Sequence, residues 1–221
     1  MPLNVRRAEG YSRWESGIYE RFIAPGALRL VVPLLNQIAD DLEPTSTVID
    51  IGCGGGQQLA HLHDVAPNLR LTGLDASKYE LAAAKTRLGD RATLVEASAD
   101  AMPIASESFD ATLSFFSIKH WPDQKLGLAE CVRITKPGGR LLITELDAGT
   151  TIREWRQFAR TTAVPPILRM LYAVGSHPVA IRSSINADDM TRLFAGLPLR
   201  DVTISRVGSS PLLVGQATIE G

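Results

Sequence analysis

Short apolar runs alternate along this chain with segments of helical periodicity, and this alternation constrains the fold more than any other feature. Five runs fall at 47–51, 69–75, 92–97, 109–116 and 140–146, and helical patterns separate them at 57–65, 77–88 and 123–134. Near-continuous apolar runs are typical of strands that are buried on both faces. The pattern therefore predicts βαβ units with right-handed connections around a parallel sheet.

The last two apolar runs, at 201–207 and 212–219, are separated only by the short stretch GSSP. Such a connection permits an antiparallel hairpin but is too short for a parallel crossover. We therefore expect an α/β fold with a seven-stranded, mostly parallel sheet that ends in an antiparallel strand.

Two segments stand outside the alternating core. Residues 1–43 carry apolar positions at helical spacing, interrupted by Pro33, and predict an N-terminal helical cover. Residues 148–198 predict helices on either side of Pro165-Pro166, and a further helix capped by Asn186. Insertions at the carboxyl edge of a parallel sheet commonly form substrate lids. The predicted organisation is a cover at 1–43 and a main domain at 44–221 that contains this lid.

Composition excludes several classes of function. The 221 residues carry 23 basic and 24 acidic side chains, so the net charge is −1. This charge argues against binding nucleic acid or an anionic membrane through bulk charge, although not against binding through a local patch. The two cysteines, Cys53 and Cys131, form neither a disulfide framework nor a metal-ligand spacing, and the pair His61-x-His63 has no third ligand nearby, so no metal site is expected. Without an apolar targeting segment or an uninterrupted run of about 20 apolar residues, we expect a cytoplasmic protein with no membrane span.

A glycine-rich loop follows the first predicted strand. TVIDI leads directly into GCGGGQQ and then into a helix, which is the place where a backbone turns sharply and approaches a ligand. Gln57 occupies the position where the dinucleotide fingerprint GxGxxG requires its last glycine. Asp75 ends the second predicted strand, where an acid can accept hydrogen bonds from ribose hydroxyls.

Four motifs in succession, VIDIGCGGG, GLDAS, MPIASESFD and ITKPGGRLLI, resemble those of class I S-adenosylmethionine-dependent methyltransferases. The similarity is greatest to the small-molecule branch that includes ubiquinone and menaquinone C-methyltransferases, and it covers about residues 45–146. The resemblance implies a Rossmann-like sheet of strand order 3-2-1-4-5-7-6, with S-adenosylmethionine as cofactor and S-adenosylhomocysteine as product.

The resemblance also implies the cofactor contacts. Around the methionine part of the cofactor it places the glycine loop, with Gly52, Gly54 and Gly56, and the acid Asp50 that fixes this loop. It adds Ser114 at the end of the fourth strand and Tyr19 of the N-terminal helix. Tyr11 is an alternative to Tyr19.

Along the adenosine part the resemblance implies Asp75 at the ribose, with Ala76 beside it, and Ser98 and Ala99 at the adenine. The family often has Gly-Asp-Ala where this chain has Ala97-Ser98-Ala99, so Ser98 replaces the acid, and Asp100 is the alternative contact.

The acceptor should lie beyond the carboxyl ends of the strands, next to the glycine loop. His120, in the loop FFSIKHWPD, is the best candidate for a general base because its ordinary pKa lies near ~6.5; a packing or cofactor-side role is the alternative. Glu145 and Asp147 are expected to face the same region, either at the acceptor or as capping residues. Convergence of several aromatic side chains would form a slot for an aromatic or apolar acceptor, the candidates being Trp14, Phe115, Phe116, Trp121, Trp155 and Tyr172.

The sequence thus predicts methyl transfer from S-adenosylmethionine to a small organic acceptor through oxygen, nitrogen or carbon. One alternative is an enzyme or binding module that uses the same cofactor without transferring its methyl group. The other is a nicotinamide-dependent oxidoreductase, against which Gln57 counts. No motif in the sequence indicates the acceptor, the methylated atom or the oligomeric state.

Overall fold

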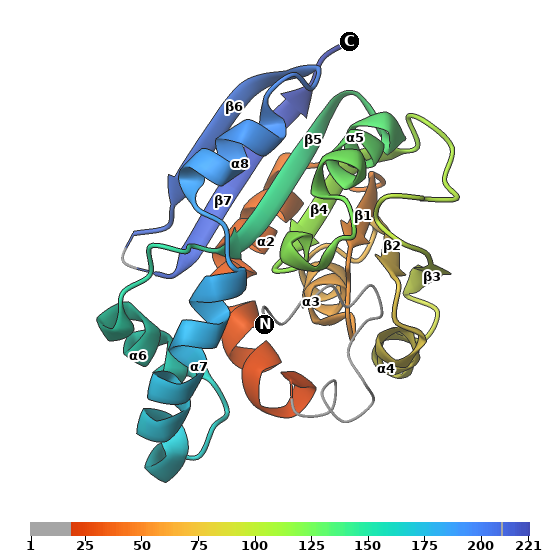
Figure 1. The fold of residues 1–221 in the computed structure, drawn as a ribbon. Helices are drawn as coiled ribbons and strands as arrows, with labels where there is room; N and C mark the ends of the chain where they lie inside the picture. The colour runs from red at the N-terminus through yellow and green to blue at the C-terminus, as the bar shows by residue number, and fades with distance from the viewer. Residues whose placement is uncertain (1–18, 209) are drawn as a thin grey trace.

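A computed structural model describes residues 19–208 and 210–221 (Figure 1). The strands are β1 (Thr47–Ile51), β2 (Arg70–Asp75), β3 (Ala92–Glu96), β4 (Phe109–Phe115), β5 (Thr135–Leu146), β6 (Leu199–Arg206) and β7 (Leu212–Ile219). The helices are α2 (Ala24–Asp41), α3 (Gln57–Val65), α4 (Lys78–Leu88), α5 (Gln124–Ile134), α6 (Ile152–Thr161), α7 (Arg169–Ser183) and α8 (Ala187–Phe194). Shorter helical turns are η1 (Tyr19–Ile23), η2 (Ile118–His120) and η3 (Pro166–Leu168).

The sheet has seven strands in the order β3-β2-β1-β4-β5-β7-β6, which confirms the predicted order. Strands β1 to β5 pair in parallel, whereas β7 pairs antiparallel with both β5 and β6. The carboxyl ends of β1, β2 and β4 therefore meet at one edge of the sheet. The loop from β1, including Gly52 to Gly56, lies at this edge.

Helices cover both faces of the sheet, so each face has its own apolar core. On one face, α2, α3 and α4 contribute Val31, Leu35, Leu59, Leu62 and Leu88. On the other face, α5 and α8 contribute the buried side chains Leu128, Cys131, Ile134, Met190 and Phe194. This two-sided burial explains why the central strands have near-continuous apolar sequences.

Helix α2 is an integral layer of the first core and continues through Pro33. The segment Arg21–Asp41 is the one described helix that is long and apolar enough to cross a membrane by length and composition. No membrane span was expected here from the sequence, because Arg29 interrupts the apolar run. In the fold, Val31 and Leu35 of this helix are fully buried in the apolar core between α2 and the sheet.

The region 148–198 divides into two parts. Helices α6 and α7 form a separate corner of the molecule with their own small core of Trp155, Phe158 and Ala173 (Figure 1). Helix α8 instead packs into the main core through Met190 and Phe194, and Asn186 caps it as predicted by accepting from the backbone N–H of Asp189. The segment 148–198 therefore contributes to two separate cores.

Strand β5 begins earlier than its apolar run suggests. Helix α5 already ends at Ile134, and β5 starts at Thr135, with a register shift against β4 between Phe109 and Ala111. The two glycines of KPGG lie in this irregular part of the pairing, where Gly138 has a φ of 77°.

Candidate functional site

The glycine loop is held tightly against the end of β2. The backbone N–H groups of Gly52 and Cys53 both donate to the carbonyl of Leu74, at 2.7 and 3.0 Å. Gly52, Gly54 and Gly56 all have positive φ, at 74°, 51° and 77°, a conformation that side chains with a Cβ rarely adopt. The sharp turn predicted from the three glycines is therefore present.

Gly52 is also required by a close approach of the loop after β4. A Cβ at Gly52 would lie 1.7 Å from Oγ of Ser117. This hydroxyl accepts a hydrogen bond from Nε1 of Trp121 at 2.9 Å, so it is fixed in position. Sequence reasoning missed Ser117, since no motif marks a serine whose partner is a glycine far away in the chain.

Asp75 ties the glycine loop to the start of α4. Its Oδ2 accepts from the backbone N–H of Gly54 at 2.9 Å, and its Oδ1 accepts from that of Ser77 at 2.8 Å. Burial raises the pKa of Asp75, and the two backbone hydrogen bonds oppose this rise. Each carboxylate oxygen retains a second lone pair for a ligand. Ala76, the neighbouring predicted contact, is exposed at the same edge.

Asp50 is the most unusual residue of the site. Its side chain is 1% exposed, and neither carboxylate oxygen has a hydrogen-bond partner among the described residues. Burial, and secondarily the charge of Asp75, raise the pKa of Asp50 to about 8. A buried carboxylate without partners is costly, and it is expected where a ligand supplies the missing donors or positive charge.

The predicted adenine-side residues follow β3 and lie beside Asp75. The N–H of Ala97 donates to the carbonyl of Asp75 at 3.1 Å, which brings the two segments together. Ala99 is buried, and the hydroxyl of Ser98 donates to Oδ1 of Asp100. Ser98 and Asp100 therefore form one hydrogen-bonded pair, and the alternatives left open by the sequence occupy the same place.

Ser114 is fully buried, and its hydroxyl donates to the carbonyl of Ile51 at 2.9 Å. This hydrogen bond joins the end of β4 to the end of β1, just before the glycine loop. In the described structure Ser114 thus braces the strand from which the loop begins.

An ion pair lies at the end of β5, at the same carboxyl edge of the sheet. Nζ of Lys119 lies 2.6 Å from Oε1 of Glu145, and the side chain of Glu145 is fully buried. The second carboxylate oxygen, Oε2, has no partner among the described residues. Asp147 is engaged elsewhere, because it accepts from the N–H of Gly149 and pairs with Arg206. Of the two acids weighed from the sequence, Glu145 is the one left with a free acceptor atom.

His120 lies next to this ion pair in the turn η2. Its side chain is exposed, yet surrounding protein atoms, and secondarily the charge of Lys119, lower its pKa to about 4. Its imidazole is therefore neutral at neutral pH and can accept a proton. Tyr19 begins η1, while the orientation of its side chain, together with Tyr11 and Trp14, lies outside the described residues.

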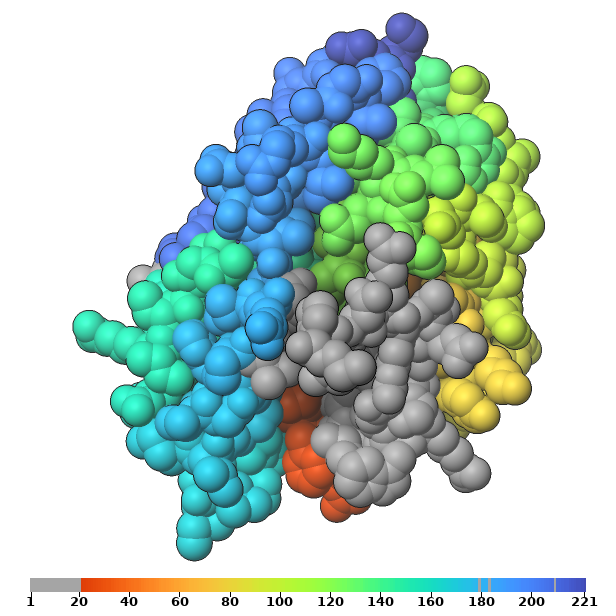
Figure 2. All heavy atoms as spheres, viewed as in Figure 1, coloured from red at the N-terminus to blue at the C-terminus, as the bar shows by residue number. Residues whose placement is uncertain are grey.

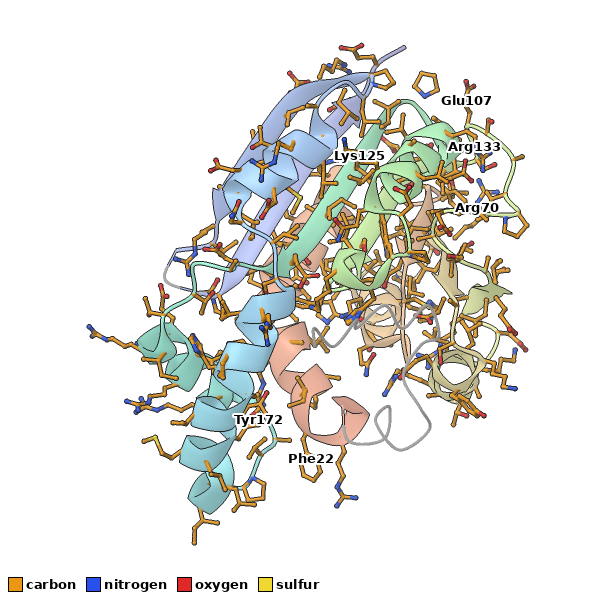
Figure 3. The ribbon with its side chains drawn as sticks, in the orientation of Figure 1. Phe22, Arg70, Glu107, Lys125, Arg133 and Tyr172 are labelled. Carbon is orange, nitrogen blue, oxygen red and sulfur yellow. The ribbon has the colours of Figure 1, made fainter. Side chains whose placement is uncertain are left out.

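The aromatic candidates with described side chains belong to separate clusters. Phe115 and Phe116 belong to the α2–α3 side of the core, Trp121 to the α5–α8 side, and Trp155 to the lid core, against which Tyr172 packs. Figure 3 shows Tyr172 on the side of α7 that faces the segment of Phe22. Among the described residues, these aromatics form no common slot.

Comparison with known proteins places the central segment in one family. Residues 49–143 match the family model described as Methyltransferase domain. A demethylmenaquinone methyltransferase of Thermotoga maritima is 38% identical over 99 residues, covering 45% of this chain and 43% of the relative. An O-methyltransferase of Pyrenophora dematioidea is 32% identical over 126 residues, covering 53% and 45%.

Among solved structures, a SAM-dependent methyltransferase from Aquifex aeolicus shares the fold with a TM-score of 0.64 at 14% identity, covering 95% of this chain and 100% of that one. The chain spans about half the length of the curated relatives that it matches.

Proposed function

We propose that this chain, which matches a methyltransferase domain over residues 49–143 and is similar to demethylmenaquinone methyltransferases, is a class I S-adenosylmethionine-dependent methyltransferase that methylates a small organic acceptor. The proposed donor is S-adenosylmethionine, and the acceptor atom is oxygen, nitrogen or carbon. The observation that carries the proposal is the unpartnered carboxylate of Asp50, buried beside a glycine loop at the carboxyl edge of the sheet.

The residues at this edge fit the proposed cofactor. The ammonium group of its methionine part would supply the positive charge and donors that Asp50 lacks. Asp75 has free lone pairs for ribose hydroxyls, and the Ser98–Asp100 pair offers acceptor atoms for an adenine amino group. Gly54 presents open backbone, since a Cβ there would meet only Oε2 of Glu80, at 3.6 Å.

When bound, S-adenosylmethionine supplies a methyl group that is already activated on a sulfonium. The protein therefore has mainly to align the acceptor, and orientation contributes on the order of 7–11 kcal/mol to lowering the barrier. We propose that the acceptor lies between the glycine loop and the Lys119–Glu145 ion pair. There, Oε2 of Glu145 can accept a hydrogen bond from a hydroxyl or amine of the acceptor.

The cofactor assignment is tested by calorimetric titration with S-adenosylmethionine, S-adenosylhomocysteine and NAD. Micromolar binding of the first two and none of NAD is the expected result. Binding of NAD alone would favour a nicotinamide-dependent oxidoreductase. Binding of S-adenosylmethionine without methyl consumption across a broad panel of acceptors would favour a non-methylating enzyme or module.

Asp75→Ala should weaken S-adenosylmethionine binding by about 1–3 kcal/mol, because ribose hydrogen bonds are lost. Ser77→Ala is the matched control, since it also disturbs the start of α4, where its hydroxyl accepts from the backbone N–H of Glu80. Unchanged affinity in a folded Asp75→Ala variant would refute the ribose assignment.

We propose His120 as the base that accepts the acceptor's proton when one must leave. With a pKa of about 4, the imidazole is neutral and active at neutral pH and becomes protonated as the pH falls through 4. At saturating S-adenosylmethionine, where the titration of Asp50 does not limit cofactor binding, the rate should therefore be flat above about pH 5 and fall below it. His120→Ala should lower turnover by about 10²–10⁴-fold, and intact turnover would exclude this role. The proposed compartment is the cytoplasm.

A further inference from the structure

The outer face of the lid carries large apolar side chains that the fold leaves uncovered. Within η3 and the first turns of α7, Ile167 is 89% exposed and Leu171 is 73% exposed. Leu168, Met170 and Val174 are each about half exposed. We call these five residues the apolar corner. Exposed apolar side chains concentrated in this way mark interaction surfaces more often than chance exposure does.

The side chains of the apolar corner are not an incomplete part of the small core of Trp155, Phe158 and Ala173. The inner side of α6 and α7 is already packed, with Trp155 and Phe158 buried and Nε1 of Trp155 donating to Oγ of Ser176 at 2.9 Å. A ring nitrogen of His177 lies 2.8 Å from the carbonyl of Thr150, which fixes α7 against the start of the lid. Tyr172 faces inward from α7 (Figure 3). The corner therefore projects from a fixed helix pair.

The same region concentrates positive charge in a chain whose net charge is −1. Between residues 150 and 185 there are five arginines and a single acid, Glu154, which pairs with Arg206. Arg153, Arg156 and Arg160 are exposed on α6, and the described residues offer them neither a hydrogen bond nor an ion pair. Their spacing places them along one side of the helix.

Figure 2 shows α6 and α7 as a corner that stands out from the molecule at the lower left of the view. A projecting helix pair with exposed apolar side chains on η3 and α7 and exposed arginines on α6 is complementary to a bilayer with anionic headgroups, because apolar side chains enter the headgroup boundary while arginines pair with phosphates. A protein partner would need a matching acidic groove, and a second copy would bring the arginines of two lids together. From this complementarity we propose that the lid docks the protein peripherally on an anionic lipid surface.

The proposal is tested by sedimentation of the full chain with vesicles of phosphatidylcholine alone or with added phosphatidylglycerol. Binding should require the anionic lipid and weaken at high salt. Ile167→Ser combined with Leu171→Ser should reduce binding at least tenfold. Arg156→Gln and Arg160→Gln should each reduce it about fivefold.

The matched control carries Lys125→Gln and Leu126→Ser on α5, a site where Leu126 is 49% exposed and which lies far from the lid (Figure 3). This control should bind vesicles like the parent. All substituted side chains are exposed, and unchanged thermal unfolding would show that the variants fold. The proposal is overturned by absent binding to anionic vesicles, or by equal losses in the control and lid variants. A dimer that the lid variant dissociates, without any vesicle binding, would instead assign the corner to a second copy.

Discussion

Replacing Asp50 by asparagine should stabilise the ligand-free protein while weakening its binding of S-adenosylmethionine. Burial, followed by the charge of Asp75, raises the pKa of Asp50 to about 8 in the fold, whereas an unfolded chain returns it to about 3.9. The folded state thus holds the proton more tightly than the unfolded state does. The stabilisation that this tighter proton binding gives to the folded state is complete below about pH 4 and is lost as the pH rises through 8.

The size of the effect follows from these two pKa values. A tenfold difference in proton affinity corresponds to about 1.4 kcal/mol, so Asp50 costs the parent on the order of 4 kcal/mol between pH 4 and pH 7. Asparagine has nearly the same shape and does not titrate. Asp50→Asn should therefore match the parent near pH 4, exceed its stability by about 1–2 kcal/mol at pH 5 and exceed it by several kcal/mol at pH 8.

Urea unfolding followed by tryptophan fluorescence at pH 5, 6.5 and 8 measures this difference. Asp110→Asn is the control with the opposite sign. Although burial alone would raise the pKa of Asp110, hydrogen bonds from Lys136 and Thr47 lower it to about 2. Its contribution is present above about pH 4 and is lost as the pH falls through 2, so the control should be less stable than the parent at pH 7. Because Asp110 is about one-third exposed, we expect a loss of only about 1 kcal/mol.

A constant stability difference between Asp50→Asn and the parent from pH 5 to pH 8 would refute the argument, since the pKa of Asp50 in the fold would then not be raised above about 5. Cofactor affinity gives a second, independent readout. If Asp50→Asn bound S-adenosylmethionine as tightly as the parent, the carboxylate would not be the partner of the cofactor's ammonium group.

Two further predictions concern neighbouring parts of the site. Gly52→Ala should destabilise the fold by about 2–4 kcal/mol, because the added methyl displaces the Ser117 hydroxyl and strains a positive φ. Gly54→Ala, where the methyl has room, should cost about 1 kcal/mol. Equal losses of stability in thermal unfolding of the two variants would contradict this distinction. Lys119→Met should lower the free energy of unfolding by about 3–5 kcal/mol, because it leaves Glu145 buried and unpaired. Urea unfolding measures this loss. If adding Glu145→Leu restores the stability, the loss is due to the buried, unpaired charge of Glu145.

The fold was predictable from the sequence because its strong signals are local. Alternating apolar runs and helical patterns located all seven strands, and Ser77, Asp123 and Asn186 cap the helices that follow them. The extent of the lid was not predictable. Residues 187–194 read like the other lid segments, and only the tertiary fold shows that Met190 and Phe194 belong to the main core.

The site was predictable where one motif determines the geometry and not where distant segments meet. The three glycines predicted the turn, and Asp75 was found from its place at the end of a strand. The contact of Gly52 with Ser117, and the bond from Ser114 to Ile51, join β4 to β1 across the sheet. A serine in an apolar run reads the same whether it braces a neighbouring strand or faces a ligand, so its partner could not be inferred.

The charges at the two edges of the sheet identify the ligand edge without reference to the glycine loop. At the amino end of β4, Asp110 is compensated within the protein by Lys136 and Thr47. At the carboxyl ends of β1 and β5, Asp50 and one oxygen of Glu145 are buried without such compensation. Burying an uncompensated acceptor costs about 1–3 kcal/mol, and among the described residues Asp50 and Glu145 bear this cost at the carboxyl edge of the sheet. In parallel strands an acid near the end of an apolar run lies at the carboxyl edge, so TVIDI and RLLITEL mark in the sequence the places where the structure buries a carboxylate oxygen without a partner.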